Sequence, residues 1–256
     1  MAGADIVKHN DHVYFTFGRF QPPTTGHQLV IEKIKELAEA NRADMYVFAS
    51  SSQNDLVALS KRKNFSRLTS KNTYTTIKLN ENPLSIEQKV TILERMYPET
   101  PIINTTRLNC RDPYRAVSRL QEAGYAKENM HMVVGGDRVE AFSKIGIDVV
   151  SAGDRSANPM SGTKMRIAAV SNDFDTFKSG IMVGNITEED AAHIMNDIRV
   201  GLGFTGGGKI KRKIRQNVKY VSQSRRHNQG LRSRHTRVQV PSRPLSTARR
   251  RRDSPA

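Results

Sequence analysis

The chain has 256 residues, enough to bury a hydrophobic core either as one domain or as a domain with an appendage. Its net charge of +16 belongs almost entirely to one end. Residues 1–203 contain 25 Lys and Arg against 24 Asp and Glu, whereas residues 204–256 contain 16 against one. The first 203 residues are therefore nearly neutral, which excludes bulk charge as an indication of nucleic-acid binding in that part of the chain.

Cys110 is the only cysteine, so the chain cannot form an intrachain disulfide, and we expect a reducing compartment. Residues 1–12 contain no apolar run of the length that a signal peptide needs, and no stretch of about 18 successive apolar residues occurs in the sequence. We therefore expect a protein of the cytoplasm, or of the interior of a host cell, without membrane association.

Short runs of β-branched and aromatic residues alternate with segments that carry apolar residues at helical spacing. The runs predict strands over residues 12–17, 45–49, 101–105, 129–134 and 147–151. The other segments predict helices over residues 26–40, 86–96, 113–123 and 190–203 and one that begins just after residue 160. Ser85 and Gln88 have the spacing of a capping box at the start of one of these helices.

Five strands alternating with helices predict an α/β fold of the Rossmann-like, doubly wound class, with a mostly parallel five-stranded sheet covered on both faces. We assign residues 1–203 to this domain. Residues 50–82 are polar and too long for an ordinary connection, so they form either a functional flap or a family-variable insertion. Residues 204–256 contain few large apolar residues, and we expect a disordered basic tail.

The segment Gly18–His27 joins the first strand to the first helix, at the edge of the sheet where such folds bind ligands. Gly26 and His27 fall at a predicted helix start, where unpaired N–H groups attract an anion. His27 and Thr24 can donate hydrogen bonds to phosphoryl oxygens, and Arg19 adds fixed positive charge. This segment suits a phosphate group.

Thr24-Thr25-Gly26-His27 resembles the threonine form of the [His or Thr]-x-Gly-His signature of a nucleotidyltransferase superfamily. The string that opens the loop is similar to the start of archaeal-type nicotinamide mononucleotide adenylyltransferases, although Pro23, Thr24 and Thr25 replace Phe-His-x. The Pro-Pro-Thr-Thr-Gly-His form resembles nucleotidyltransferase-like proteins of bacteriophages and large viruses. The resemblance implies nucleotide binding by Gly18, Arg19, Phe20, Gln21 and Gly26.

The segment Met160–Arg166 resembles the second signature of that superfamily, Ile-Ser-Ser/Gly-Thr-x-x-Arg, with Met in place of Ile. Hydroxyl groups at a helix start can cap the helix and point toward a triphosphate, while cations can neutralise a leaving pyrophosphate. We expect nucleotide binding by Ser161, Gly162 and Thr163 and catalytic roles for Lys164 and Arg166.

Two further segments resemble parts of the same family. Asn82 and Ser85 lie in an Asn-Pro-Leu-Ser string similar to the Asn-Pro-Phe-Thr of the archaeal enzymes, which implies a place near the acceptor. Turning the chain and capping a helix explain them equally well. Asp137 and Arg138 lie in a Gly-Gly-Asp-Arg string after the fourth strand, which implies contacts with the nucleotide, and Asp137 is an equally natural helix cap.

The resemblance implies an enzyme that transfers a nucleoside monophosphate from an NTP to a phosphate-bearing acceptor and releases pyrophosphate, with His27, Thr24, Lys164 and Arg166 as the catalytic residues. We favour ATP, with nicotinamide mononucleotide as one candidate acceptor; the alternative is a CTP-dependent cytidylyltransferase. The histidines outside the loop do not form a metal-binding pattern. Mg²⁺ is still expected, carried mainly by the nucleotide phosphates.

A hypothesis of another class is a nucleic-acid- or particle-associated protein whose nucleotidyltransferase-like domain is a binding scaffold. Residues 204–256 favour it, since their cations would bind phosphate backbones without sequence preference. A nuclear-localisation-like signal and a solvated end are the other interpretations of this charge.

Overall fold

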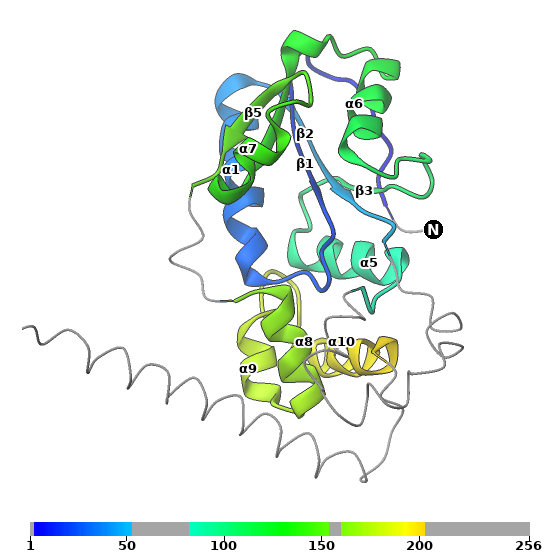
Figure 1. Cartoon of the computed structure of the whole chain (residues 1–256), viewed down its shortest axis with the longest axis vertical. Coiled ribbons are helices and arrows are strands. Elements are labelled where there is room, and N and C mark those ends of the chain that lie inside the picture. Colours follow the sequence, from blue (N-terminus) through cyan, green and yellow to red (C-terminus); the bar gives the residue numbers. More distant parts are fainter. Residues whose placement is uncertain (1–2, 53–81, 154–159, 203–256) are drawn as a thin grey trace, which may run out of the picture. The chain divides into compact units, whose positions relative to one another are not determined.

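The computed structural model describes residues 3–52, 82–153 and 160–202. Within these ranges, five strands form one fully parallel sheet in the order β3-β2-β1-β4-β5 (Figure 1). They are β1 (Val13–Gly18), β2 (Asp44–Ala49), β3 (Ile102–Asn104), β4 (Met130–Val134) and β5 (Asp148–Ser151). Each bound lies within one residue of the prediction, and the Rossmann-like α/β class is confirmed.

The helices of the described ranges are α1 (Gln28–Asn41), α5 (Ile86–Met96), α6 (Pro113–Glu122), α7 (Val139–Phe142), α8 (Gly162–Ser171), α9 (Phe174–Ser179) and α10 (Glu188–Gly201). The predicted capping box at α5 is confirmed: Gln88 N–H donates to Ser85 Oγ at 3.2 Å, and Ser85 N–H donates to Gln88 Oε1 at 2.9 Å. Helices α7 and α9 were not predicted, because so few residues give no readable helical period.

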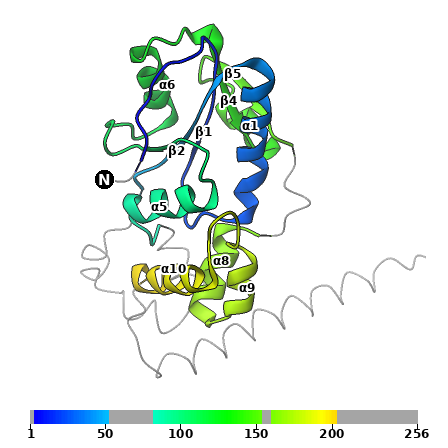
Figure 2. The ribbon, with the colours of Figure 1, turned by 180° about the vertical axis from the view of Figure 1, so that it is seen from behind.

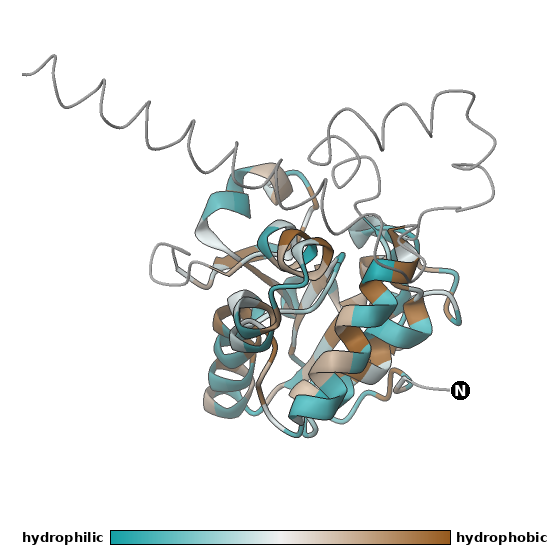
Figure 3. Ribbon diagram, turned by 90° about the horizontal axis from the view of Figure 1, so that it is seen from below, coloured by the Kyte–Doolittle hydropathy of each residue, from teal (hydrophilic) through white to brown (hydrophobic). Residues whose placement is uncertain are grey.

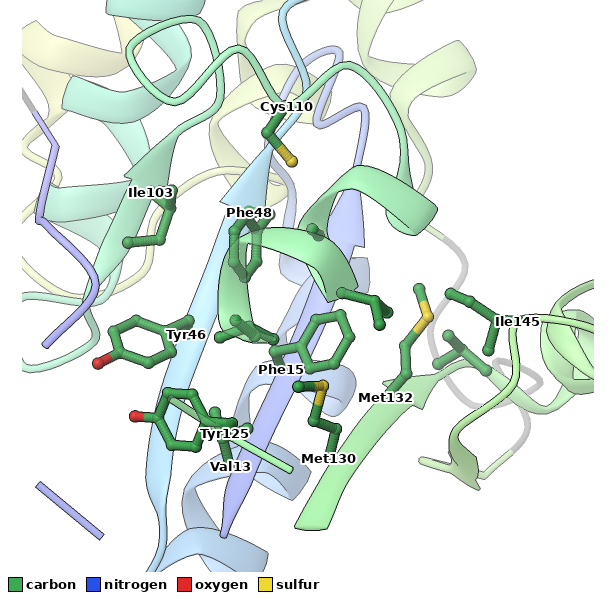
Figure 4. Packing of buried hydrophobic residues seen from close by; sticks show 14 residues of the cluster. Val13, Phe15, Tyr46, Phe48, Ile103, Cys110, Tyr125, Met130, Met132 and Ile145 are labelled. Carbon is green, nitrogen blue, oxygen red and sulfur yellow. The ribbon is translucent and has the colours of Figure 1, made fainter. Parts of the chain in front are cut away.

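One face of the sheet holds a hydrophobic core closed by α6 and α7. Alternate strand residues point into it, among them Val13 and Phe15 of β1. Phe15 and Phe48 meet edge to face, with ring centroids 5.7 Å apart. Figure 4 shows the ring of Phe15 between that of Phe48 and the side chain of Met132 of β4. Burial of such large side chains is the main source of stability at this face.

Of the other helices, two pack on the sheet and three pack against one another. Helix α1 packs on β1, β2 and β4, whereas α5 packs on β2 and β3; Figures 1 and 2 show α1 and α6 on opposite sides of the strands. Helices α8, α9 and α10 pack against one another. The helices carry both apolar and polar residues, as Figure 3 shows, which is typical of elements with one buried side.

The segment before β1 is tied to the edge of the sheet, a feature that the sequence did not predict. Ala4 forms a parallel bridge with Ile103, and its N–H donates to the carbonyl of Ile102 at 2.7 Å. Farther along, the carboxylate of Asp44 accepts hydrogen bonds from the backbone N–H groups of His9 and Asn10, both at 2.9 Å. The bridge of Ala4 covers part of the open edge of β3, whereas the contacts of Asp44 fix the segment at the start of β2.

Two predictions concern segments outside the described residues. Most of the proposed flap or insertion, residues 53–81, lies there, as does the basic tail, residues 204–256. Both stay predictions. Among the helices of the described ranges, none has the length and apolar character needed to cross a membrane.

Candidate nucleotide-binding site

A pocket with a volume of about 410 Å³ lies at the carboxyl ends of β1 and β4. Its lining combines the end of β1 and the following loop, part of α1, the end of β4 and the start of α8, with Pro113 and Phe142 on a further wall. The parallel sheet explains this location, because all strands end at the same edge and the loops that follow them converge there.

Ten of the residues proposed from the sequence line this pocket: Gly18, Arg19, Phe20, Gln21, His27, Arg138, Ser161, Gly162, Thr163 and Arg166. The lining thus includes three arginines and one histidine but, among the described residues, no Asp or Glu. Arg138 lies 3.5 Å from the carboxylate of its neighbour Asp137, which remains outside the lining. An excess of fixed positive charge in a concave site attracts anions such as phosphates.

The two signature segments are in direct contact, and glycines permit that contact. A Cβ atom placed on Gly26 would lie 2.4 Å from the carbonyl oxygen of Met160, and one on Gly162 would lie 2.7 Å from the carbonyl oxygen of Gln21. Any larger side chain would therefore separate the loop after β1 from the start of α8. The resemblance pointed to nucleotide contacts for both glycines, and the geometry gives them a packing requirement as well.

His27 ends a short 3-10 helix, Thr25–His27, and contributes to the pocket lining. Its ring packs against that of Phe20, with centroids 4.9 Å apart and planes tilted by 55°. Nδ1 of His27 accepts the backbone N–H of Thr24 at 3.0 Å, and the hydroxyl of Thr24 lies at the same distance from Nδ1. The imidazole is therefore held at Nδ1 by Thr24 and at its ring by Phe20.

Arg166 is almost fully buried and joins the two signature segments. Its guanidinium donates a hydrogen bond to the carbonyl oxygen of Gln21 and another, at 3.2 Å, to the hydroxyl of Thr163. The planar fork of an arginine suits such simultaneous contacts. Ser161 is the N-cap of α8, with its Oγ accepting the N–H of Lys164 at 3.3 Å, so the predicted cap is confirmed.

Gln21 is buried, and its side chain is engaged with backbone groups. The amide nitrogen donates to the carbonyls of Ser52 at 2.9 Å and Leu84 at 2.8 Å, while the amide oxygen accepts the N–H of Leu84 at 3.0 Å. Phe20, its neighbour, has a φ of 47° in the left-handed region, which non-glycine residues rarely adopt. These contacts fix the course of the loop at the pocket.

Lys89 on α5 is a residue that sequence reasoning did not select. Its side chain is fully buried, and its Nζ donates to the carbonyl oxygens of Arg19 at 3.2 Å, Ser52 at 3.3 Å, and Ser50. Burial lowers the pKa of Lys89 to about 8, an effect that Arg19 increases and Glu87 partly offsets. Lys89 thereby joins α5 to the ends of β1 and β2.

Six proposed residues lie outside the pocket lining: Thr24, Gly26, Asn82, Ser85, Asp137 and Lys164. Thr24 and Gly26 lie directly behind His27, in the turn that presents it. Ser85 is occupied as the N-cap of α5, whereas Lys164 and Asp137 are exposed. Asp137 does not cap the helix that follows it; that helix, α7, begins after Arg138 without a side-chain cap.

No protein-family model matches the chain, and no curated protein matches it either. Similar solved structures do exist. One is a putative nicotinate-nucleotide adenylyltransferase from Vibrio parahaemolyticus, with 13% identity, a TM-score of 0.42 and coverage of 77% of this chain and 98% of that one. Another is the Plasmodium falciparum nicotinic acid mononucleotide adenylyltransferase complexed with APC, with 12% identity, a TM-score of 0.39 and coverage of 77% and 99%.

Within the described residues, no group of three or more His, Cys, Asp or Glu side chains could hold a metal ion. Cys110 is buried in the core, and burial together with the charge of Asp112 raises the pKa of its thiol to about 11.

Proposed function

We propose that the protein is a nucleotidyltransferase that transfers a nucleoside monophosphate, AMP in preference to CMP, from an NTP to a phosphate-bearing acceptor. The observation that carries the proposal is the convergence of two separate signature segments on one pocket. His27 from the first segment and Ser161, Thr163 and Arg166 from the second line the same cavity. Neither segment alone would indicate this reaction.

In the proposed reaction, a phosphate oxygen of the acceptor attacks the α-phosphorus of the NTP. A new P–O bond forms while the bond between the α-phosphorus and its bridging oxygen to the β-phosphate breaks, and pyrophosphate leaves. Two anions must be brought into line, so positioning and electrostatic stabilisation supply most of the catalysis. His27 and Arg166 would bind the phosphates, with the N-terminus of α8 beside them.

Arg19 and Arg138 line other parts of the pocket and would offset the charge of the second anion. The apolar wall that contains Pro113, Val134 and Phe142 suits the planar base of a nucleotide. Because the described lining contains no carboxylate, we propose that Mg²⁺ enters with the triphosphate, held by phosphate oxygens and water.

The decisive experiment incubates the full chain with Mg²⁺ and either ATP or CTP labelled at the α-phosphate. The acceptors tested are nicotinamide mononucleotide, nicotinic acid mononucleotide and a series of phosphorylated alcohols. We expect transfer of label to an acceptor together with release of pyrophosphate, and a higher rate with ATP. Transfer from CTP alone would establish the cytidylyltransferase alternative, and absence of transfer with every pair would contradict the proposal.

A matched pair of histidine variants tests the site itself. We expect His27→Asn to lower the rate by about 10²- to 10³-fold, as the loss of one donor to a developing charge does elsewhere. His193→Asn, on the exposed side of α10, is the control and should keep the wild-type rate. Equal rates for the two variants would show that His27 has no part in the reaction.

The basic tail supports a second hypothesis, in which the chain binds nucleic acid through residues 204–256. Truncation after Gly203 should then abolish binding to duplex DNA and RNA at low salt while leaving nucleotidyl transfer intact. Loss of transfer on truncation would instead assign the tail to the active site. A truncated chain that still binds nucleic acid would contradict the hypothesis.

A further inference from the structure

The backbone N–H of Thr24 determines which nitrogen of His27 carries a proton. This N–H lies 3.0 Å from His27 Nδ1. A backbone amide can only donate a hydrogen bond, so Nδ1 must offer its lone pair as the acceptor. In the neutral imidazole the single ring proton then lies on Nε2.

The hydroxyl of Thr24 also favours an unprotonated Nδ1. Its oxygen accepts the N–H of Gly26 at 3.2 Å, and it lies 3.0 Å from His27 Nδ1. Because Nδ1 acts as an acceptor, the hydroxyl is the donor in this contact and shares the single Nδ1 lone pair with the backbone N–H. Thr24 is only 1% exposed, so water does not compete for these contacts. A buried donor of this kind is costly to leave unpaired, which favours the arrangement.

We propose that Thr24 is a positioning residue, which fixes His27 in the tautomer with a proton on Nε2 and so makes the ring a hydrogen-bond donor toward a phosphate in the pocket. Thr24 itself lies outside the lining, behind the ring, whereas His27 lies in it. The inference rests on the proposed function for the identity of the ligand but not for the tautomer. It replaces a direct phosphate contact by Thr24, which the sequence suggested.

The tautomer matters because the oxygens of a phosphate diester or triphosphate are acceptors. An Nε2 lone pair would repel them, while an Nε2–H group donates to them without requiring a charged ring. Packing of the ring against Phe20 restrains its orientation further. In metal sites, loss of the partner that orients an imidazole through its other nitrogen costs about 10- to 100-fold in metal affinity or activity, and we expect an effect of this order here.

The first experiment determines the tautomer of His27 directly and does not depend on enzymatic activity. Full-length protein labelled with nitrogen-15 at histidine is studied by long-range proton–nitrogen NMR, at a pH well above the usual histidine pKa of about 6.5. His27→Asn assigns the signals by their loss. We expect His27 to have a protonated Nε2 and an unprotonated Nδ1. A protonated Nδ1, or a mixture of both tautomers, would overturn the inference.

The second experiment separates positioning from a merely structural cap. Thr24→Val keeps the size of the side chain and removes its hydroxyl, whereas Thr24→Ser keeps the hydroxyl. Thr187→Val is the matched control, because Thr187 caps α10 through its Oγ, which accepts the N–H of Asp190 at 3.1 Å. Both valine variants remove a threonine cap and should lower the urea midpoint, with the larger fall for Thr24→Val because Thr24 is buried and Thr187 is exposed.

Only Thr24→Val should alter the NMR signals of His27 and lower kcat, by about 10- to 100-fold, and Thr24→Ser should restore both. Unchanged His27 signals and kcat in Thr24→Val would contradict a positioning role. If the wild-type chain has the expected tautomer but transfers no nucleotide, the proposed function fails and the assignment of Thr24 to the tautomer stands.

Discussion

The ammonium group of Lys89 donates a hydrogen bond to the carbonyl oxygen of Arg19 across 3.2 Å, and this contact joins the first turn of α5 to the loop that follows β1. Two more carbonyls, of Ser50 and Ser52, accept from the same ammonium group after the end of β2. Three donors on one flexible side chain thus satisfy three acceptors from two separate loops. The loop that carries His27 is supported from behind by this contact.

Replacement of Lys89 by Met should therefore destabilise the domain. Met has a similar length and fills the space, but the carbonyls of Arg19 and Ser50 lose the hydrogen bond from Lys89, while that of Ser52 keeps the one from the Gln21 amide. Loss of a partner by a buried polar group costs about 1–3 kcal/mol. We expect the free energy of unfolding in urea to fall by at least this amount. Lys33→Met, at a partly exposed position on α1, is the control and should stay within about 0.5 kcal/mol of the wild type. Equal midpoints for both variants would contradict the role of Lys89.

The buried ammonium should also give stability a distinctive pH dependence. Burial lowers the pKa of Lys89 from its ordinary value of 10.5 to about 8. Between these two values the unfolded chain binds more protons than the folded one, so the free energy of unfolding should rise with pH in this range. Urea titrations from pH 8 to pH 10.5 test this, with Lys89→Met as the reference. A wild-type curve parallel to that of the variant would show that the pKa is not lowered.

The sequence predicted the sheet well because its strands obey local rules. Runs such as Val13–Phe17 are apolar, short and followed by glycine, and their alternation with helices determines the fold class. The capping box of Ser85 and Gln88 is equally local. Only the resemblance of both segments to one family indicated that the loop after β1 and the start of α8 lie together. The packing between them could not be predicted, because the two segments are far apart in the sequence.

Other features could not be predicted because they depend on contacts between distant segments. Lys89 lies in an amphipathic helix, where a lysine usually indicates the solvated side; its burial depends on carbonyls from two loops. The hydrogen bonds of Gln21 with Ser52 and Leu84 are of the same kind. The very short helix α7, with Phe142 in the pocket wall, has no periodic pattern that could reveal it.

The close approach of Gly26 to Met160 predicts a variant that affects function and stability together. In Gly26→Ala the new Cβ would lie 2.4 Å from a backbone carbonyl, which cannot move without shifting the segment that leads to Arg166. We expect a loss of about 1–3 kcal/mol in the free energy of unfolding, as for other overpacked sites. We also expect a fall in kcat/KM for nucleotidyl transfer.

Gly146→Ala is the contrasting variant. Gly146 has a φ of +79°, but a Cβ there would meet nothing within 4 Å. It should therefore cost about 1–2 kcal/mol of backbone strain and leave kcat/KM per folded molecule unchanged. A Gly26→Ala protein with wild-type stability and activity would show that the two signature segments do not depend on this contact.

The hydrogen bonds of Asp44 predict how the stability of the domain changes in acid. Its carboxylate accepts hydrogen bonds from Tyr125 Oη at 2.5 Å and from His9 and Asn10. Burial alone would raise the pKa of Asp44, but the hydrogen bonds from Tyr125, Asn10 and His9 outweigh it and hold the pKa below its usual value. A depressed pKa in the folded state means that the carboxylate contributes stability above its usual pKa and that this contribution is lost as pH falls through the folded value.

We therefore expect Asp44→Asn to lower the free energy of unfolding at neutral pH, since one polar group of Asn would face donors instead of accepting from them. The difference in the free energy of unfolding between the variant and the wild type should shrink as the pH falls below the usual aspartate pKa of about 4. Urea titrations at neutral and acidic pH measure it. Asp11→Asn, at a strongly exposed position, is the control and should give a small difference at every pH. A gap for Asp44→Asn that stayed constant into acid would show that the wild-type carboxylate has an ordinary pKa, and that its contacts with the segment before β1 do not depend on its charge.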